Sequence, residues 1–139
     1  MHDTIFFSAC DLINLYKSKK LSPVENLKNT FDVIKKLNPK LNAFISIAEK
    51  KAMKQAKFSE LNYLNNTERT LEGIPFGLKD VIDVQQEKTM NGSKLFETSE
   101  VKKNNATVVN KLIDEGAIYI GKLHTHELAI GAPTFSGID

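Results

Sequence analysis

The amino-acid sequence predicts an α/β fold in which helices at the amino terminus lead into part of a helix-covered β-sheet. Up to about residue 70, apolar residues recur mostly at the three- and four-residue spacing of amphipathic helices. From residue 71 onward, strand-like and helix-like patterns alternate, which is typical of an α/β sheet. Residues 117–121 form an almost uninterrupted apolar run, as expected of a strand covered on both faces.

The composition is that of a globular domain. At 139 residues, with 41% hydrophobic and 26% charged residues, the chain suits one packed domain of ordinary size. Its net charge of +2 is small and its lysines are scattered, so nucleic-acid binding is not expected. The single cysteine, Cys10, excludes an internal disulfide and suits a reducing compartment. The start carries no basic leader and no run is long enough to cross a bilayer, so we expect a cytoplasmic chain without a membrane partner.

The amino-terminal third predicts two helices. The first covers residues 8–18, and its apolar face consists of Ala9, Leu12, Ile13 and Tyr16. The second begins at a strong start signal, with Ser22 as N-cap, Pro23 at the first helical position and Glu25 completing a capping box. We expect this helix to stop at Asn38-Pro39, since the residue before a proline is pushed out of the helical region.

The middle of the chain predicts a strand at residues 43–47, a helix from 49 to about 64 and a polar loop at 65–69. Residues 73–84 then set Lys79 in an apolar stretch that contains two glycines and a proline. Lysine is rarely buried unless it is paired or used chemically. Lys79 is therefore either a solvated corner at the end of a strand or a functional residue.

The last third continues the alternation. Residues 85–88 form a charged connector and residues 89–93 a tight turn. Asn104 or Asn105 is expected to cap the next helix, and Gly116 to end it in the left-handed conformation. The strand at 117–121 is then expected to run parallel to the strand that precedes this helix.

Polar residues follow the last strand at its carboxyl end, where α/β sheets gather their ligand sites. His124, His126 and Glu127 could be metal ligands, but their spacing lacks the helical geometry of a zinc-protease motif and no second ligand cluster exists. A hydrogen-bonded loop role is favoured. No glycine-rich phosphate loop is present, and Ser93 has no base beside it in the sequence. We expect neither a metal nor a cofactor.

Several ordered motifs resemble the amidase signature family. Residues 71–80, Leu-Glu-Gly-Ile-Pro-Phe-Gly-Leu-Lys-Asp, are similar to the lysine motif of that family almost residue for residue. Thr89, Gly92 and Ser93 stand where the family has a Thr-x-x-Gly-Ser turn. Further segments similar to the family precede the lysine motif at residues 21–25 and 38–44. Others follow it, in the same order and spacing as in the family, at residues 106–109, 116–122 and 126–129. This ordered series makes the resemblance specific.

The resemblance implies that residues 1–139 are the amino-terminal portion of a single amidase signature domain. Residues 1–70 would be its mainly helical part, and residues 71–139 the start of the catalytic α/β core with a mixed β-sheet. In the family, both catalytic serines and the oxyanion hole lie beyond the equivalent of Asp139. The chain by itself is accordingly expected to be inactive.

The resemblance also implies a chemical role for Lys79, as the base of a Ser-cisSer-Lys triad that cleaves amide bonds through a serine acyl-enzyme. Accepting a proton near neutral pH requires a neutral amine. Burial among Leu78, Val81 and Ile82 is expected to lower the pKa of Lys79 and so to favour that form. Arginine would not serve, because it stays charged.

Three hypotheses about function follow. The first is an amidase with a small-molecule amide substrate, whose coding sequence is cut short before the carboxy-terminal part of the domain. The second is a non-catalytic module that docks on a partner chain, either that missing part or a like chain. The third is the A subunit of a tRNA-dependent amidotransferase. Residues 121–127 depart from the Gly-Lys-Thr-Asn-Met pattern common in such subunits, which favours the stand-alone amidase.

Overall fold

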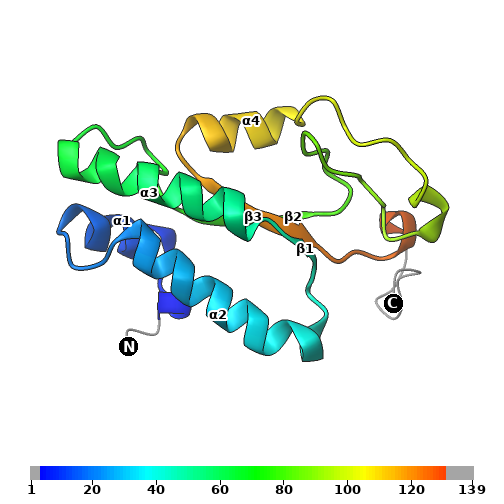
Figure 1. Cartoon of the computed structure of the whole chain (residues 1–139), viewed down its shortest axis with the longest axis horizontal. Helices are drawn as coiled ribbons and strands as arrows, with labels where there is room; N and C mark the ends of the chain where they lie inside the picture. Colours follow the sequence, from blue (N-terminus) through cyan, green and yellow to red (C-terminus); the bar gives the residue numbers. More distant parts are fainter. Residues whose placement is uncertain (1–3, 131–139) are drawn as a thin grey trace.

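The computed structural model describes residues 4–130, in which helices cover both faces of a small mixed sheet (Figure 1). Short 3₁₀ helices are labelled η. In chain order the elements are η1 (Thr4–Phe6), α1 (Ala9–Lys17), α2 (Pro23–Leu41), β1 (Phe44–Ile47), α3 (Glu49–Asn65), β2 (Pro75–Lys79), η2 (Lys94–Phe96), α4 (Thr107–Asp114), β3 (Ile118–Leu123) and η3 (Glu127–Ala129). The predicted α/β fold class is confirmed.

The sheet has the strand order β1-β3-β2, so the last strand in sequence lies at the centre. β1 pairs with β3 in antiparallel orientation, and β2 pairs with β3 in parallel orientation. The connection between the parallel strands β2 and β3 contains α4. Parallel strands require such a long crossover connection, because the chain has to return to the end of the sheet at which the first strand began. The expected parallel pair and the expected mixed sheet are both present.

The core is divided by β3, because successive side chains of a strand point to opposite faces. Ile118 and Ile120 pack in one cluster with α2 and α3, whose buried members are Leu27, Phe31, Ile34, Ala52 and Ala56. Tyr119 packs in a second cluster with Val109 of α4 and Leu78 of β2. Figure 1 shows α2 and α3 running side by side, with α4 away from them across the strands.

The helix starts follow their sequence signals. Ser8 and Asp11 form a capping box at α1, and Ser22 and Glu25 form another at α2, with Pro23 in its first turn. Each box satisfies backbone N–H groups that the first turn of a helix leaves unpaired. The predicted start of the second helix is confirmed.

The predicted stop of that helix at Asn38-Pro39 is wrong. α2 continues through Pro39 to Leu41 and ends at Asn42, which adopts the left-handed conformation with φ 49°. Asn38 stays helical because its side chain is held from outside the helix. Its amide oxygen accepts from the Phe44 N–H at 2.8 Å, and its amide nitrogen donates to the Phe44 carbonyl at 2.9 Å. These bonds offset the restriction that proline places on its predecessor.

The predicted cap of α4 is also wrong, because the N-cap residue is Ala106 and no side chain caps the helix. The Asn105 side chain is occupied elsewhere: it accepts from the Gln85 N–H at 2.7 Å and donates to Asn110 at 2.9 Å. The end of this helix is as predicted, since Gly116 follows it with φ 94°.

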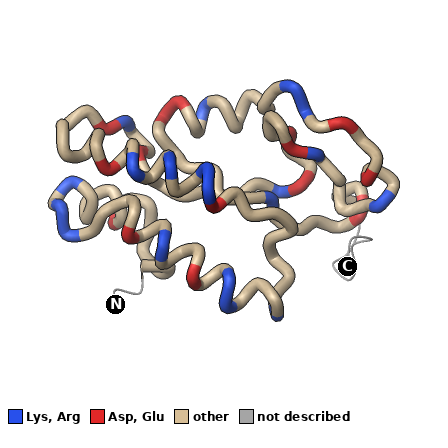
Figure 2. Tube along the Cα trace, viewed as in Figure 1, with Lys and Arg blue, Asp and Glu red and all other residues tan. Residues whose placement is uncertain are grey.

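Charged residues of both signs are spread over the helices and loops, and basic and acidic positions lie close to one another along the trace (Figure 2). Within residues 4–130, no helix combines the length and the apolar character needed to cross a membrane.

Candidate active site

Lys79 is the last residue of β2 and lies at the carboxyl end of the parallel strand pair, opposite Leu123 of β3. The chain turns immediately after it. The N–H groups of Val81 and Ile82 both donate to the Lys79 carbonyl, at 2.8 and 3.0 Å. Asp80 N–H donates back to the Leu123 carbonyl at 3.0 Å, so the turn remains attached to the central strand. This end of the sheet is where α/β folds commonly bind ligands.

The Lys79 side chain is exposed, which corrects the expectation that its sequence neighbours bury it. Leu78 belongs to the cluster with Val109 and Tyr119. Strand side chains alternate, so Lys79 points to the opposite face and is left in solvent. Residues adjacent in a strand do not share a face, and the apolar neighbours therefore do not desolvate this lysine within the described part of the chain.

The lysine buried at this end of the sheet is Lys122 of β3, with a relative exposure of only 1%. Its Nζ lies 3.2 Å from Oδ1 of Asp80, which is also 1% exposed, and donates to the Ile82 carbonyl at 2.5 Å. Thr89 Oγ1 lies 3.4 Å from the same nitrogen. Sequence reasoning missed this pair, because its members are distant in the chain. The one available signal was a lysine placed directly after a fully apolar strand.

The loop after β2 is fastened to the same pair. The Asp80 carboxylate accepts from the Met90 N–H at 3.0 Å, and the Asp80 carbonyl accepts from the Asn91 N–H at 3.0 Å. Thr89 donates to Asp83 at 2.7 Å. That hydrogen bond, together with Lys102 at 3.3 Å, holds the pKa of Asp83 below its usual value. The carboxylates of Asp80 and Asp83 thus bind the turn after β2 to residues 89 and 90 of the following loop.

A second loop, after β3, packs on the first. Ser93 is buried and donates to Glu127 Oε1 at 2.6 Å, and the Leu128 N–H donates to the Asn91 carbonyl at 2.7 Å. η2 and η3 accordingly lie side by side in Figure 1. Glu127 therefore has the hydrogen-bonded loop role favoured from the sequence. The predicted tight turn is also present, with left-handed φ values at Asn91 and Gly92.

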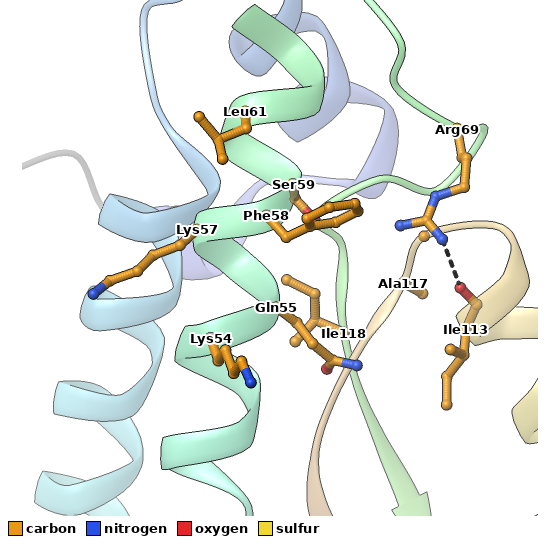
Figure 3. A pocket seen from close by; sticks show the side chains of 11 residues that line it. Lys54, Gln55, Lys57, Phe58, Ser59, Leu61, Arg69, Ile113, Ala117 and Ile118 are labelled. Carbon is orange, nitrogen blue, oxygen red and sulfur yellow. Dashed lines mark hydrogen bonds between the residues drawn. The ribbon is translucent and has the colours of Figure 1, made fainter. Parts of the chain in front are cut away.

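Two concave regions differ in their relation to Lys79. A hollow of about 420 Å³ lies between β1 and residues 87–90, and Asp80 and Lys122 form part of its wall. A groove of about 470 Å³ lies instead between α3 and the chain that enters β3, as Figure 3 shows for Phe58, Ile113 and Ile118. The groove belongs to the amino-terminal end of β3, so it is not part of the site around Lys79.

Comparison with known proteins gives consistent matches. A model of the family described as Amidase matches residues 25–138. The A subunit of the glutamyl-tRNA(Gln) amidotransferase of Thermoanaerobacter pseudethanolicus is 37% identical over 124 residues, covering 89% of this chain and 25% of the relative. The protein of the same name from Dehalococcoides mccartyi is 36% identical over 134 residues, covering 96% of this chain and 27% of the relative. The chain thus spans about a quarter of the length of these relatives.

Solved structures of amidases share the fold. The native peptide amidase of Stenotrophomonas maltophilia superposes with a TM-score of 0.81 at 25% identity, over 90% of this chain and 26% of the other. A bacterial aryl acylamidase of the amidase signature family gives a TM-score of 0.80 at 24% identity, over 88% of this chain and 26% of the other. The family match over most of the chain, supported by these structures, shows that the chain belongs to the amidase family.

Proposed function

We propose that this chain forms the amino-terminal part of an enzyme that cleaves an amide C–N bond through a serine acyl-enzyme, with Lys79 as the base. The observation that carries the proposal is the placement of Lys79. It lies exposed at the carboxyl end of β2, in the segment that resembles the lysine motif of the family, and the turn behind it is fixed by a buried ion pair. An exposed amine on a fixed backbone is accessible to groups from the remainder of a domain.

The proposed reaction uses Lys79 in its neutral form. The amine accepts a proton through the hydroxyl of a bridging serine, and the nucleophilic serine attacks the amide carbonyl. The amine leaving group departs with a proton, and water then hydrolyses the acyl-enzyme. The described residues leave the Lys79 side chain in solvent.

The test uses the chain joined to the carboxy-terminal remainder of the Thermoanaerobacter pseudethanolicus relative, a protein we call the joined enzyme. Release of ammonia or amine from small-molecule amides is measured. We expect turnover in the joined enzyme and none in residues 1–139 alone. Lys79→Ala is expected to lower turnover by about 10²- to 10⁴-fold, the usual contribution of a general base.

The matched control is Lys103→Ala, which removes another exposed lysine from the same half of the chain. We expect it to keep the turnover of the parent. If Lys79→Ala retained turnover to within about threefold, far less than the loss of a general base, Lys79 would be a structural lysine and the proposed mechanism would be wrong.

A second candidate function is that of an amidotransferase subunit, which the names of the relatives favour. It shares the amide cleavage with the first candidate and differs in what receives the ammonia. With glutamine as the amide, glutamyl-tRNA(Gln) as acceptor and a nucleoside triphosphate to activate the glutamate carboxylate, an amidotransferase supplied with its other subunits would convert the tRNA-bound glutamate to glutamine, the carboxylate oxygen leaving as phosphate. A stand-alone amidase would release ammonia and leave the tRNA-bound residue unchanged.

A further inference from the structure

We propose that Lys122 is a positioning residue for Lys79, acting through Asp80 and the turn that follows β2. The inference rests on the proposed role of Lys79 as the base. Lys122 does not reach the reacting atoms in this proposal. Its ammonium group holds the backbone from which the Lys79 side chain projects.

The first observation is that the Lys122–Asp80 pair is fully buried, with each residue 1% exposed. Taking two charges out of water costs several kcal/mol per ion, so a buried pair is a poor source of stability compared with apolar residues of similar size. In some proteins such a pair is retained because it selects one conformation. Each charge requires its partner, and alternative arrangements of the turn would leave one of them unpaired.

The second observation is that Lys122 binds the turn at two points. Its Nζ lies 3.2 Å from Asp80 Oδ1, but the angles there do not form a hydrogen bond. The ammonium group donates hydrogen bonds to the Ile82 carbonyl at 2.5 Å and to Thr89 Oγ1 at 3.4 Å. One ammonium group therefore fixes a side chain at the start of the turn and a carbonyl at its end.

The third observation connects the turn to Lys79 itself. The Lys79 carbonyl accepts from both Val81 and Ile82, so it is bonded only as long as the turn keeps its shape. Asp80 extends the connection to the neighbouring loop through Met90 and Asn91. A rearrangement of the turn would reorient the peptide group of Lys79 and displace its amine.

The fourth observation is that β3 is bulged where it supplies Lys122. Phe76 pairs with Tyr119 and Gly77 pairs with Gly121, so Ile120 is an extra residue in β3. Simple alternation from Ile118 and Ile120 would send Lys122 towards α2 and α3. The extra residue places it opposite Leu78, on the face of the sheet that carries Tyr119. Bulges beside functional sites commonly redirect a side chain in this way.

The test compares three variants in the joined enzyme: Lys122→Met, Asp80→Asn with Lys122→Met, and Lys79→Ala. In Lys122→Met the buried Asp80 carboxylate loses its partner. We expect kcat per folded molecule to fall about 100-fold, the order of loss that a displacement of 1 Å produces. KM is expected to remain near that of the parent, because the substrate pocket is not touched.

The double variant provides the second measurement, and it is informative even if Lys122→Met does not fold. It leaves no buried charge, and the amide oxygen introduced at position 80 would still accept from Met90, so the double variant is expected to fold. The double variant lacks the contact between Lys122 and the Ile82 carbonyl, so its kcat should be about 10-fold lower than that of the parent. This loss is smaller than in Lys122→Met, because Lys79 is expected to be displaced less. The matched control is Lys35→Met, which removes the exposed ion pair with Glu49 at 2.8 Å and is expected to leave kcat unchanged.

A double variant with the kcat of the parent would overturn the proposal, as would a folded Lys122→Met variant with unchanged kcat. Lys79→Ala separates this failure from failure of the proposed function. If Lys79→Ala abolishes turnover while the Lys122 variants keep it, Lys79 is the base and Lys122 does not position it. If Lys79→Ala itself keeps turnover, the proposed function fails and this inference fails with it.

Discussion

Both ends of β2 carry a buried carboxylate, but the two are held in different ways. Glu72, before the strand, is 0% exposed and accepts hydrogen bonds from Ser59 at 2.5 Å, Asn62 at 3.0 Å and Arg69 through its backbone N–H and two guanidinium nitrogens at 2.7 to 3.3 Å. Asp80, after the strand, is 1% exposed and has one backbone donor, Met90, and the ion pair with Lys122. Every acceptor position of Glu72 is in use, whereas Asp80 depends on a single charged partner.

We interpret the Glu72 end of β2 as a structural anchor and the Asp80 end as part of the candidate active site. The Glu72 cluster joins α3 to the sheet, and Arg69 extends it to the Ile113 carbonyl at the end of α4, the bond drawn in Figure 3. A fully satisfied buried network stabilises one packing arrangement. Asp80 has fewer hydrogen-bond partners than Glu72, and it directly follows the exposed Lys79 in the sequence. Proteins commonly accept such local compromises where function requires particular groups.

The largest expected effect is at the anchor. Glu72→Ala removes the acceptor of Ser59, Asn62 and Arg69 together. We expect it to lower the free energy of unfolding by roughly 3 kcal/mol, the lower end for breaking a buried ion pair, because the Arg69 side chain is 40% exposed and can be hydrated. Urea denaturation of the parent and the variant measures the difference. A loss below about 1 kcal/mol, the net value of one ordinary hydrogen bond, would contradict the anchor role.

Two glycines allow the ends to be compared with the same substitution. An added Cβ at Gly116 would lie 2.8 Å from the Glu72 Cα, and one at Gly92 would lie 2.6 Å from the Thr125 carbonyl oxygen. Both residues have positive φ, at 94° and 69°. Each Gly→Ala change is expected to cost about 1 to 3 kcal/mol in unfolding free energy.

The consequences of the two glycine changes should differ by location. Gly116→Ala is expected to lower the protection of backbone amides against hydrogen exchange around the Glu72 cluster. Gly92→Ala is expected to lower this protection in residues 89–93 and 124–128. Hydrogen exchange measures both patterns. Identical patterns for the two variants would show that the ends of β2 do not respond independently.

The pH dependence of stability should reflect Glu72. Burial alone would raise the pKa of Glu72, but hydrogen bonds from Arg69, Ser59 and Asn62 outweigh it and lower the pKa below its usual 4.5. A carboxyl with a lower pKa in the folded state stabilises the fold above its unfolded pKa, and this contribution is lost as pH falls through the folded value.

Glu72→Gln is the matched variant for this effect. The difference in unfolding free energy between the parent and Glu72→Gln should be constant near neutral pH and should decrease as pH falls below about 4.5, the usual Glu72 value. Urea denaturation at a series of pH values measures it. A difference that grew towards acid would mean that the pKa of Glu72 is raised.

The smallest expected effect on stability is at Lys79. Its side chain is exposed, so Lys79→Ala should change the free energy of unfolding by no more than about 0.5 kcal/mol. Thermal or urea denaturation checks this value. A loss comparable with that of Glu72→Ala would assign Lys79 to the structural framework. Residues central to the proposed chemistry and residues central to stability thus occupy opposite ends of one strand.

What the sequence predicted well was local. The capping box of Ser22 and Glu25 and the terminator Gly116 involve residues within one helical turn, and both were found as expected. The two wrong boundaries arose from contacts that local patterns do not contain. Asn38 is held by Phe44, and Asn105 is engaged by Gln85 across 20 residues.

The candidate site shows the same limit. The lysine motif placed Lys79 at the end of a strand, which the structure confirms, but its burial was inferred from sequence neighbours, of which Leu78 faces the other side of the sheet. The buried lysine was Lys122, which lies 42 positions from Asp80 and is directed to it by a bulge. A bulge changes the face of every later residue in a strand, so alternation alone could not predict that contact.

The central position of β3 also bears on how the chain folds as it is made. Ser46 of β1 and Lys122 of β3 are paired in the sheet and lie 76 residues apart in the sequence. At synthesis rates of about 5–20 residues per second, Lys122 is therefore added roughly 4 to 15 s after Ser46. α2 and α3 are close in sequence and can associate within that interval. Both outer strands keep backbone groups that β3 will later pair until residues 118–123 emerge, and unpaired strand edges of this kind can pair with wrong partners.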